Sequence, residues 1–177
     1  MENFIVVITN KQVMKKIINI GCANGHTGGK GLKMKTKKYE LTNEAINHAG
    51  RILYRIKALM DFETVLGTVK AGDLGGFVGG GDNLSHNGTA WIYNDAKVYD
   101  NAIVAEDAVI CDYAEVYDYA VIYGCAEVHN HAVIHGHAAV LDCARIYDNA
   151  DVRDWVNVGR NITICGDTIL KGNIILS

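Results

Sequence analysis

From residue 92 onward, hydrophobic and polar residues recur with a strict period of six. The chain reads IYNDAK, VYDNAI, VAEDAV, ICDYAE, VYDYAV, IYGCAE, VHNHAV, IHGHAA, VLDCAR, IYDNAD, VRDWVN, VGRNIT, ICGDTI and LKGNII. The first position of these fourteen hexapeptides is always Ile, Val or Leu, and the fifth is Ala ten times in succession, from Ala96 to Ala150. The third is Asn, Asp or Gly except at Glu106 and Arg160. Because no insertion interrupts this period, the pattern predicts a repeat architecture.

Each preferred position of the hexapeptide has a physical reason. An aliphatic residue every six positions fills a repeating interior, and a small residue four positions later fits where the backbone turns against that interior. Asn, Asp and Gly tolerate positive φ best, so the third position is predicted to be a corner. A helix would need apolar spacings of three and four, which the pattern lacks.

The repeat resembles that of left-handed parallel β-helices, in which three hexapeptides form one triangular coil. The resemblance covers Ala90 to Ser177 and implies an all-β fold with about five coils at the usual interstrand spacing of about 4.8 Å. Residues eighteen apart should then stack, which places Lys97 over Glu115 and Glu127 over Arg145 as cross-coil ion pairs. One outer column is mostly apolar and is a candidate interface. It contains Ile103, Val121, Ala139, Asn157 and Ile175.

Upstream of the repeat, the sequence predicts a small β cap over residues 37–87. "KYELT" and "RILYRIKAL" have strand character, and "AGDLGGFVGGGDNLS" is a glycine-rich run that leads into the first coil. The segment resembles the N-terminal cap of YdcK-like hexapeptide-repeat proteins of bacteria and phages. The matching positions are Leu53, Arg55 and Ile56, Gly72–Gly76, and Asn83–Ser85. We predict three parts: an extension with a basic linker (1–36), the cap (37–87) and the β-helix (88–177).

Four histidines lie close together in "AEVHNHAVIHGHAAV", namely His129, His131, His135 and His137. The coil register makes all four outward-facing and spreads them over different columns, whereas a zinc site needs three or four ligands that converge on one point. The sequence therefore favours surface residues over a metal site. If the chain is an enzyme, His135 and His137 are the candidates for a general base between subunits. Zinc or acyl-CoA is expected only in that case, and the unbroken register leaves no loop to build a pocket.

Composition adds expectations about compartment and partners. No signal peptide or membrane span is evident, so a cytoplasmic location is expected, with Cys125 and Cys143 as stacked but free thiols. Residues 87–177 carry 5 Lys and Arg against 13 Asp and Glu. This negative charge disfavours nucleic acid and makes a basic protein one candidate partner. Ile174, Ile175 and Leu176 in the last coil favour a homo-oligomer, either a dimer or a trimer.

These observations favour a non-catalytic, oligomeric β-helix module that binds another macromolecule and is encoded by a phage or mobile element. Two alternatives stay open. One is a hexapeptide-repeat acyltransferase or metal-dependent enzyme with a site between subunits. The other is a counter-defence inhibitor that uses its acidic face to occupy a basic groove of its target.

Overall fold

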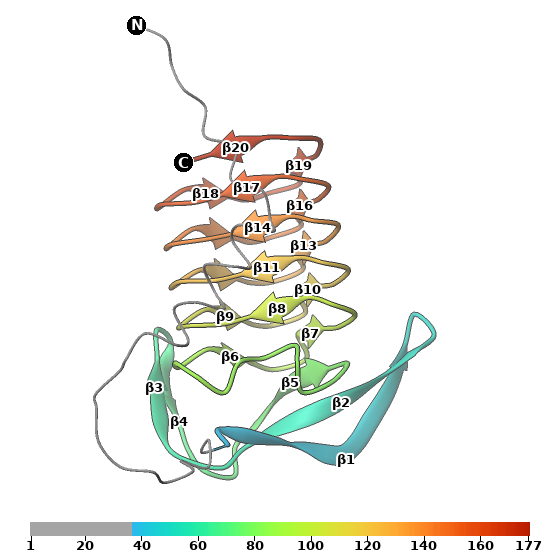
Figure 1. The fold of residues 1–177 in the computed structure, drawn as a ribbon, viewed down its shortest axis with the longest axis vertical. Coiled ribbons are helices and arrows are strands. Elements are labelled where there is room, and N and C mark those ends of the chain that lie inside the picture. Colours follow the sequence, from blue (N-terminus) through green and yellow to red (C-terminus); the bar gives the residue numbers. More distant parts are fainter. Residues whose placement is uncertain (1–36) are drawn as a thin grey trace, which may run out of the picture. The chain divides into compact units, whose positions relative to one another are not determined.

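The computed structural model describes residues 37–177, and every regular element within them is a β-strand (Figure 1). The predictions made for residues 1–36 lie outside the described part. Five longer strands come first, followed by a stack of short parallel strands. The first five are β1 (Tyr39–His48), β2 (Arg51–Ala58), β3 (Phe62–Thr64), β4 (Gly67–Val69) and β5 (Leu74–Val78).

Fifteen two-residue strands, β6 to β20, form the stack. Each consists of the sixth residue of one hexapeptide and the first of the next, so the side chains alternate between the outside and the interior. Their bounds are β6 Trp91–Ile92, β7 Lys97–Val98, β8 Ile103–Val104, β9 Val109–Ile110, β10 Glu115–Val116, β11 Val121–Ile122, β12 Glu127–Val128, β13 Val133–Ile134, β14 Ala139–Val140, β15 Arg145–Ile146, β16 Asp151–Val152, β17 Asn157–Val158, β18 Thr163–Ile164, β19 Ile169–Leu170 and β20 Ile175–Leu176.

The short strands pair in parallel with strands three places away, which forms three sheets around one interior. Two sheets have the orders β20-β17-β14-β11-β8 and β18-β15-β12-β9-β6. The third contains β5-β7-β10-β13-β16-β19 and continues antiparallel into β2 and β1. With β5 and an isolated bridge between Leu84 and Val104, the solenoid has about six turns. The predicted all-β parallel solenoid is confirmed, and it begins one turn before the first hexapeptide.

The interior is built from the repeat positions that the sequence assigned to it. The Ala residues at fifth positions, from Ala96 to Ala150, are completely buried, as are first-position residues from Ile92 to Val158. The third-position residues have positive φ throughout, including Glu106 (59°) and Arg160 (53°). The predicted corner is therefore confirmed, and the two exceptional residues adopt the same backbone as the Asp, Asn and Gly residues around them.

The predicted cross-coil ion pairs are also present. Lys97 Nζ lies 3.4 Å from Glu115 Oε1, and Arg145 Nη2 lies 3.1 Å from Glu127 Oε1. The register pairs Ile103 with Val121, Val121 with Ala139, and Asn157 with Ile175. The eighteen-residue rule thus places outward side chains correctly along the stack.

One prediction about the cysteines is wrong. Cys125 and Cys143, at fourth positions of successive turns, form a disulfide with their Cα atoms 4.7 Å apart. The repeat spacing alone brings two such residues within disulfide range. The free-thiol prediction gave more weight to an expected reducing compartment than to this geometry. Among the described residues, Cys111 and Cys165 are free thiols.

Candidate functional site

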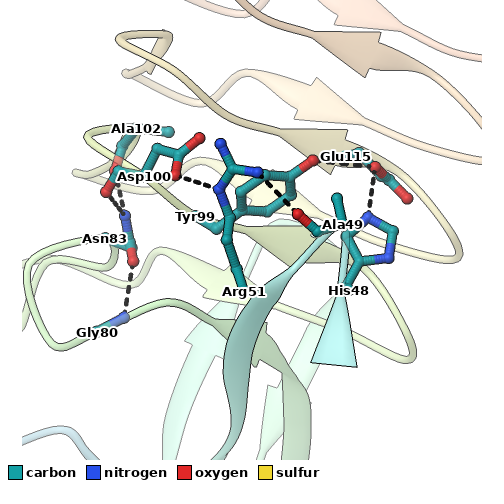
Figure 2. Close-up of polar contacts among 9 residues, drawn as sticks. All are labelled: His48, Ala49, Arg51, Gly80, Asn83, Tyr99, Asp100, Ala102 and Glu115. Carbon is teal, nitrogen blue, oxygen red and sulfur yellow. Dashed lines mark hydrogen bonds and ion pairs between the residues drawn. The ribbon is translucent and has the colours of Figure 1, made fainter. Parts of the chain in front are cut away.

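A pocket lies where the β1–β2 hairpin meets the first solenoid turns. Figure 2 shows polar contacts made by several of its residues. Its volume is about 280 Å³, and its lining is Arg51, Ile52, Leu53, Gly79, Gly80, Asp82, Asn83, Tyr99 and Asp100. This pocket does not follow from the sequence pattern. Its polar residues come from three separate stretches of the chain. They converge only because the hairpin packs against the solenoid, and the sequence pattern does not indicate where the hairpin lies.

A tight hairpin turn places the charged residues of this region. Ala49 and Gly50 connect β1 to β2, and both have positive φ, at 50° and 76°. Two-residue turns of this kind match the natural twist of the paired strands. Arg51 then donates through Nε to Asp100, and its guanidinium carbon lies 5.3 Å from the centre of the Tyr99 ring. The hairpin is thereby fixed to the solenoid by charge and by a cation–π contact.

The buried side chain of Asn83 connects the loop after β5 to the first solenoid turn by hydrogen bonds. Its Oδ1 accepts the Gly80 N–H at 2.9 Å, and its Nδ2 donates to the carbonyls of Asp100 and Ala102 at 3.1 and 2.8 Å (Figure 2). A buried amide with its donors and acceptor satisfied in this way holds a loop in one conformation. The Asn83-Leu84-Ser85 motif therefore has a structural role at the start of the solenoid.

The Glu115 carboxylate makes polar contacts with three side chains beside the pocket. His48 Nε2 lies 3.0 Å away, and the Lys97 Nζ and Tyr99 hydroxyl lie 3.4 and 3.3 Å away. Burial, and secondly the Glu115 carboxylate, raise the pKa of Tyr99 well above its usual value. The phenol therefore stays protonated and can donate to Glu115. The pocket beside this cluster is lined by three charged side chains, Arg51, Asp82 and Asp100.

Three of the four predicted histidines, His131, His135 and His137, stack on neighbouring aromatic rings. His137 is sandwiched between Tyr119 and Trp155, with centroid distances of 4.9 and 4.0 Å and nearly parallel planes. We call these three residues the aromatic ladder. They occupy fourth positions of successive turns, and Tyr119 and Trp155 are about half exposed. On another corner, His131 stacks on Tyr113 at 5.1 Å.

His135 lies in a column of second-position residues next to the aromatic ladder. Its ring stacks on Tyr117 at 4.8 Å, and Tyr117 in turn stacks on Tyr99 at 5.1 Å. Its Nε2 lies 3.3 Å from Asp151 Oδ1, and its Nδ1 lies 3.7 Å from Asp118 Oδ2. Both ring nitrogens thus face carboxylates, and the edge combines aromatic surface with negative charge.

The fourth predicted histidine, His129, lies in a separate polar cluster. Its Nδ1 is 2.9 Å from the Cys111 sulfur, and its Nε2 is 3.0 Å from Glu127 Oε2. The order thiol, imidazole, carboxylate resembles that of a nucleophile with its base. However, burial, and then the Asp112 carboxylate, raise the pKa of the Cys111 thiol to about 12. This disfavours the thiolate that attack would require.

The proposed interface residues differ in accessibility. Val121 and Ala139 are buried, and Ile103 is partly buried. In the last turn, Ile175 is 40% exposed, and Ile174 and Leu176 are partly buried. The exposed apolar surface of this set is therefore concentrated at β20.

The sequence matches no protein-family model and no curated protein. Within the described residues, no helix is long and apolar enough to span a membrane.

Proposed function

We propose that this protein is a non-catalytic, oligomeric binding module that recognises a basic segment of another protein through the edge carrying the aromatic ladder. We further propose that its solenoid is a left-handed hexapeptide-repeat helix of the YdcK-like kind, located in the cytoplasm and encoded by a phage or mobile element. The observation that carries the proposal is the stack of Tyr119, His137 and Trp155, which gives a rigid and partly exposed aromatic strip.

Rigid aromatic side chains are effective binding anchors because little conformational entropy is lost when a partner covers them. Each ring of the ladder is already held in place by its neighbours one turn away, so the strip is preorganised. A partner that covers it would remove the exposed apolar surface of two large side chains, Tyr119 and Trp155, from water.

Charge supports a basic partner. The residues from 87 to 177 carry eight more acidic than basic side chains, 13 against 5. Asp118, which directly precedes Tyr119, keeps about two fifths of its side chain exposed. Lysine and arginine side chains would gain both carboxylate contacts and cation–π contacts at such an edge.

The enzyme alternative has less support from the geometry. His135 lies between two carboxylates and His137 between two rings, and neither lines the pocket near the hairpin. A general base would instead require a second subunit to complete a site. The inhibitor alternative uses the same acidic edge and differs only in the biological identity of the partner.

Binding can be tested with the full chain and a series of Lys- and Arg-rich peptides, with acidic peptides of the same length as controls. Trp155 is exposed and Trp91 is buried, so Trp91→Phe leaves one fluorescent reporter at the proposed surface. We expect binding of basic peptides that weakens as salt is raised, because the contacts are between exposed charges.

A matched pair of substitutions identifies the surface. Tyr119 and Tyr113 are both 55% exposed, and each stacks on a histidine, but they lie on different corners. Tyr119→Ala should weaken peptide binding at least tenfold, the range typical of an aromatic anchor, whereas Tyr113→Ala should leave it unchanged. Equal effects of the two substitutions, or no salt-sensitive binding, would contradict the proposal.

A further inference from the structure

Cys111, Asp112 and His129 bring three different metal-ligand atoms together on one face of the solenoid. One atom from each, a sulfur, a carboxylate oxygen and an imidazole nitrogen, lies within 4.8 Å of the other two. The Cys111 sulfur is 2.9 Å from His129 Nδ1 and 3.8 Å from Asp112 Oδ2. These residues come from adjacent turns, since Cys111 and His129 are eighteen residues apart in the same column.

His129 is already oriented as a metal ligand would be. Its Nε2 lies 3.0 Å from Glu127 Oε2, and Glu127 is itself held by Arg145. When the imidazole N–H is donated to that carboxylate, the lone pair of Nδ1 points toward Cys111. Metal-bound histidines characteristically make this second hydrogen bond to a carboxylate, which fixes the tautomer and the ring orientation. The side chains of His129 and Glu127 are largely buried, so the arrangement is shielded from competing water.

Asp112 keeps acceptor capacity for an ion. Its Oδ2 accepts the Asn130 N–H at 3.1 Å, and its Oδ1 accepts an N–H of the Asn94 amide at 3.1 Å. Each carboxylate oxygen has a second lone pair, so these bonds do not exhaust the group. Its positive φ of 60° places it at the corner directly after Cys111.

We propose that Cys111, Asp112 and His129 form a binding site for one zinc-type divalent ion, with Glu127 as the residue that positions His129. The thiol gives up its proton to solvent when its sulfur binds the ion. Zinc bonds of about 2.3 Å to sulfur and 2.0–2.1 Å to nitrogen imply about 3.5 Å between the two atoms at tetrahedral geometry. The present 2.9 Å contact therefore has to open slightly.

The ligand set selects the class of metal. A thiolate with an imidazole suits Zn²⁺ or its spectroscopic substitute Co²⁺, whereas Mg²⁺ and Ca²⁺ prefer oxygen ligands alone. Three protein ligands leave a fourth position for water or for a group from a partner. This inference does not depend on the proposed peptide-binding function, since the cluster lies in a different column from the aromatic ladder.

Cobalt binding to a full-length variant with Cys22→Ser and Cys165→Ser gives the first test. In this background Cys111 is the one cysteine outside the disulfide. We expect saturating Co²⁺ to produce a thiolate-to-cobalt charge-transfer band in the near ultraviolet. The band should disappear when Cys111→Ser is added, and this comparison also holds if Cys125 and Cys143 are reduced. Absence of the band, or its persistence after Cys111→Ser, would overturn the proposal.

Zinc affinity, measured by competition with a chromogenic chelator on metal-stripped protein, gives the second test. Cys111→Ser and His129→Gln should each weaken binding more than tenfold, and Glu127→Gln should weaken it ten- to a hundredfold, as for other carboxylates that orient a ligand. Cys165→Ser lies in the same column and should have no effect. Circular dichroism establishes that each variant is folded. Zinc binding that depends on Cys22 and not on Cys111 would contradict the assignment.

Discussion

At the scale of single residues, the corners explain why the third position of the repeat is so restricted. Asp112, Asp118 and Asp154 have φ near 60°, a region that most side chains avoid. Each carboxylate also accepts the backbone N–H of the third-position residue one turn later, for example Gly136 N–H to Asp118 at 3.1 Å. Aspartate therefore combines tolerance of the conformation with a hydrogen bond between turns, which explains its frequency there.

Lys38 is a buried lysine whose pKa is lowered by folding. It is 3% exposed, and its Nζ donates to the carbonyls of Gly88 and Ala90 at 3.2 and 2.7 Å. Burial lowers its pKa from 10.5 to about 8, partly offset by Asp107, which raises it. The two carbonyls favour the charged form of the amine. The pKa is nevertheless lowered because the cost of desolvating the charge is larger.

This change in pKa predicts a dependence of stability on pH. Between pH 8 and 10.5 the unfolded lysine binds a proton that the folded one has lost, so the free energy of unfolding should rise with pH. Lys38 should contribute up to about 1.4 kcal/mol per pH unit to this rise in the free energy of unfolding. Urea unfolding of wild type and Lys38→Met at several pH values isolates it. Tyr39, whose pKa burial raises to about 12, has the opposite effect above pH 10 but is present in both proteins. A wild-type-minus-variant difference that stays constant from pH 7 to 10 would refute the prediction.

At the scale of elements, the repeat could be predicted almost completely from the sequence. A strict period assigns each residue to a strand, the interior or a corner, and the eighteen-residue register then gives its neighbours in adjacent turns. The stacking of His137 between Tyr119 and Trp155 follows from this rule alone. The pocket at the hairpin did not follow, because it depends on how a non-repeating hairpin packs against the solenoid. The same register places His129 next to Cys111, and this contact is present at 2.9 Å.

The passage from the cap into the solenoid depends on two glycines of β5. A Cβ added at Gly76 would lie 2.5 Å from both the Ala96 carbonyl oxygen and the Ile92 side chain, and Gly75 is similarly enclosed. These contacts are shorter than van der Waals separation, and the backbone oxygen cannot move away without disturbing β7. This close backbone packing allows the cap sheet to continue into the solenoid.

Alanine substitutions should distinguish these glycines from those of the neighbouring loop. Gly76→Ala should lower the free energy of unfolding by about 1–3 kcal/mol or more, as overpacking does elsewhere. Gly81→Ala, where an added Cβ would meet nothing within 4 Å, should change it by less than about 0.5 kcal/mol. Chemical denaturation measures both. A similar small effect at the two positions would show that β5 can move away from the first hexapeptide at little cost.

At the scale of the whole molecule, the first and last strands of the described solenoid have different surroundings. β1 and β2 extend the sheet beside β5, whereas β18, β19 and β20 are the last strands of their sheets in the described chain. Ile169 and Ile175 are exposed there. Leu170 is only partly buried, although the residues that match it in earlier turns, Val152 and Ile134, are completely buried. Unpaired strand edges beside exposed apolar side chains favour pairing with another chain.

A second copy of this chain is the partner that we expect at these strands. The net charge of the solenoid would repel another copy along its sides, but the last turns carry Arg160 and Lys171 against a single acidic residue, Asp167. Native mass spectrometry should therefore detect a dimer, and Ile175→Lys should shift it to monomer by placing like charges opposite each other. Leu74→Lys is the matched control, because Leu74 is also exposed but lies in β5. A monomer at all concentrations would contradict the expectation. An oligomer resistant to Ile175→Lys but sensitive to Ile103→Lys would instead indicate side-by-side packing through the apolar column.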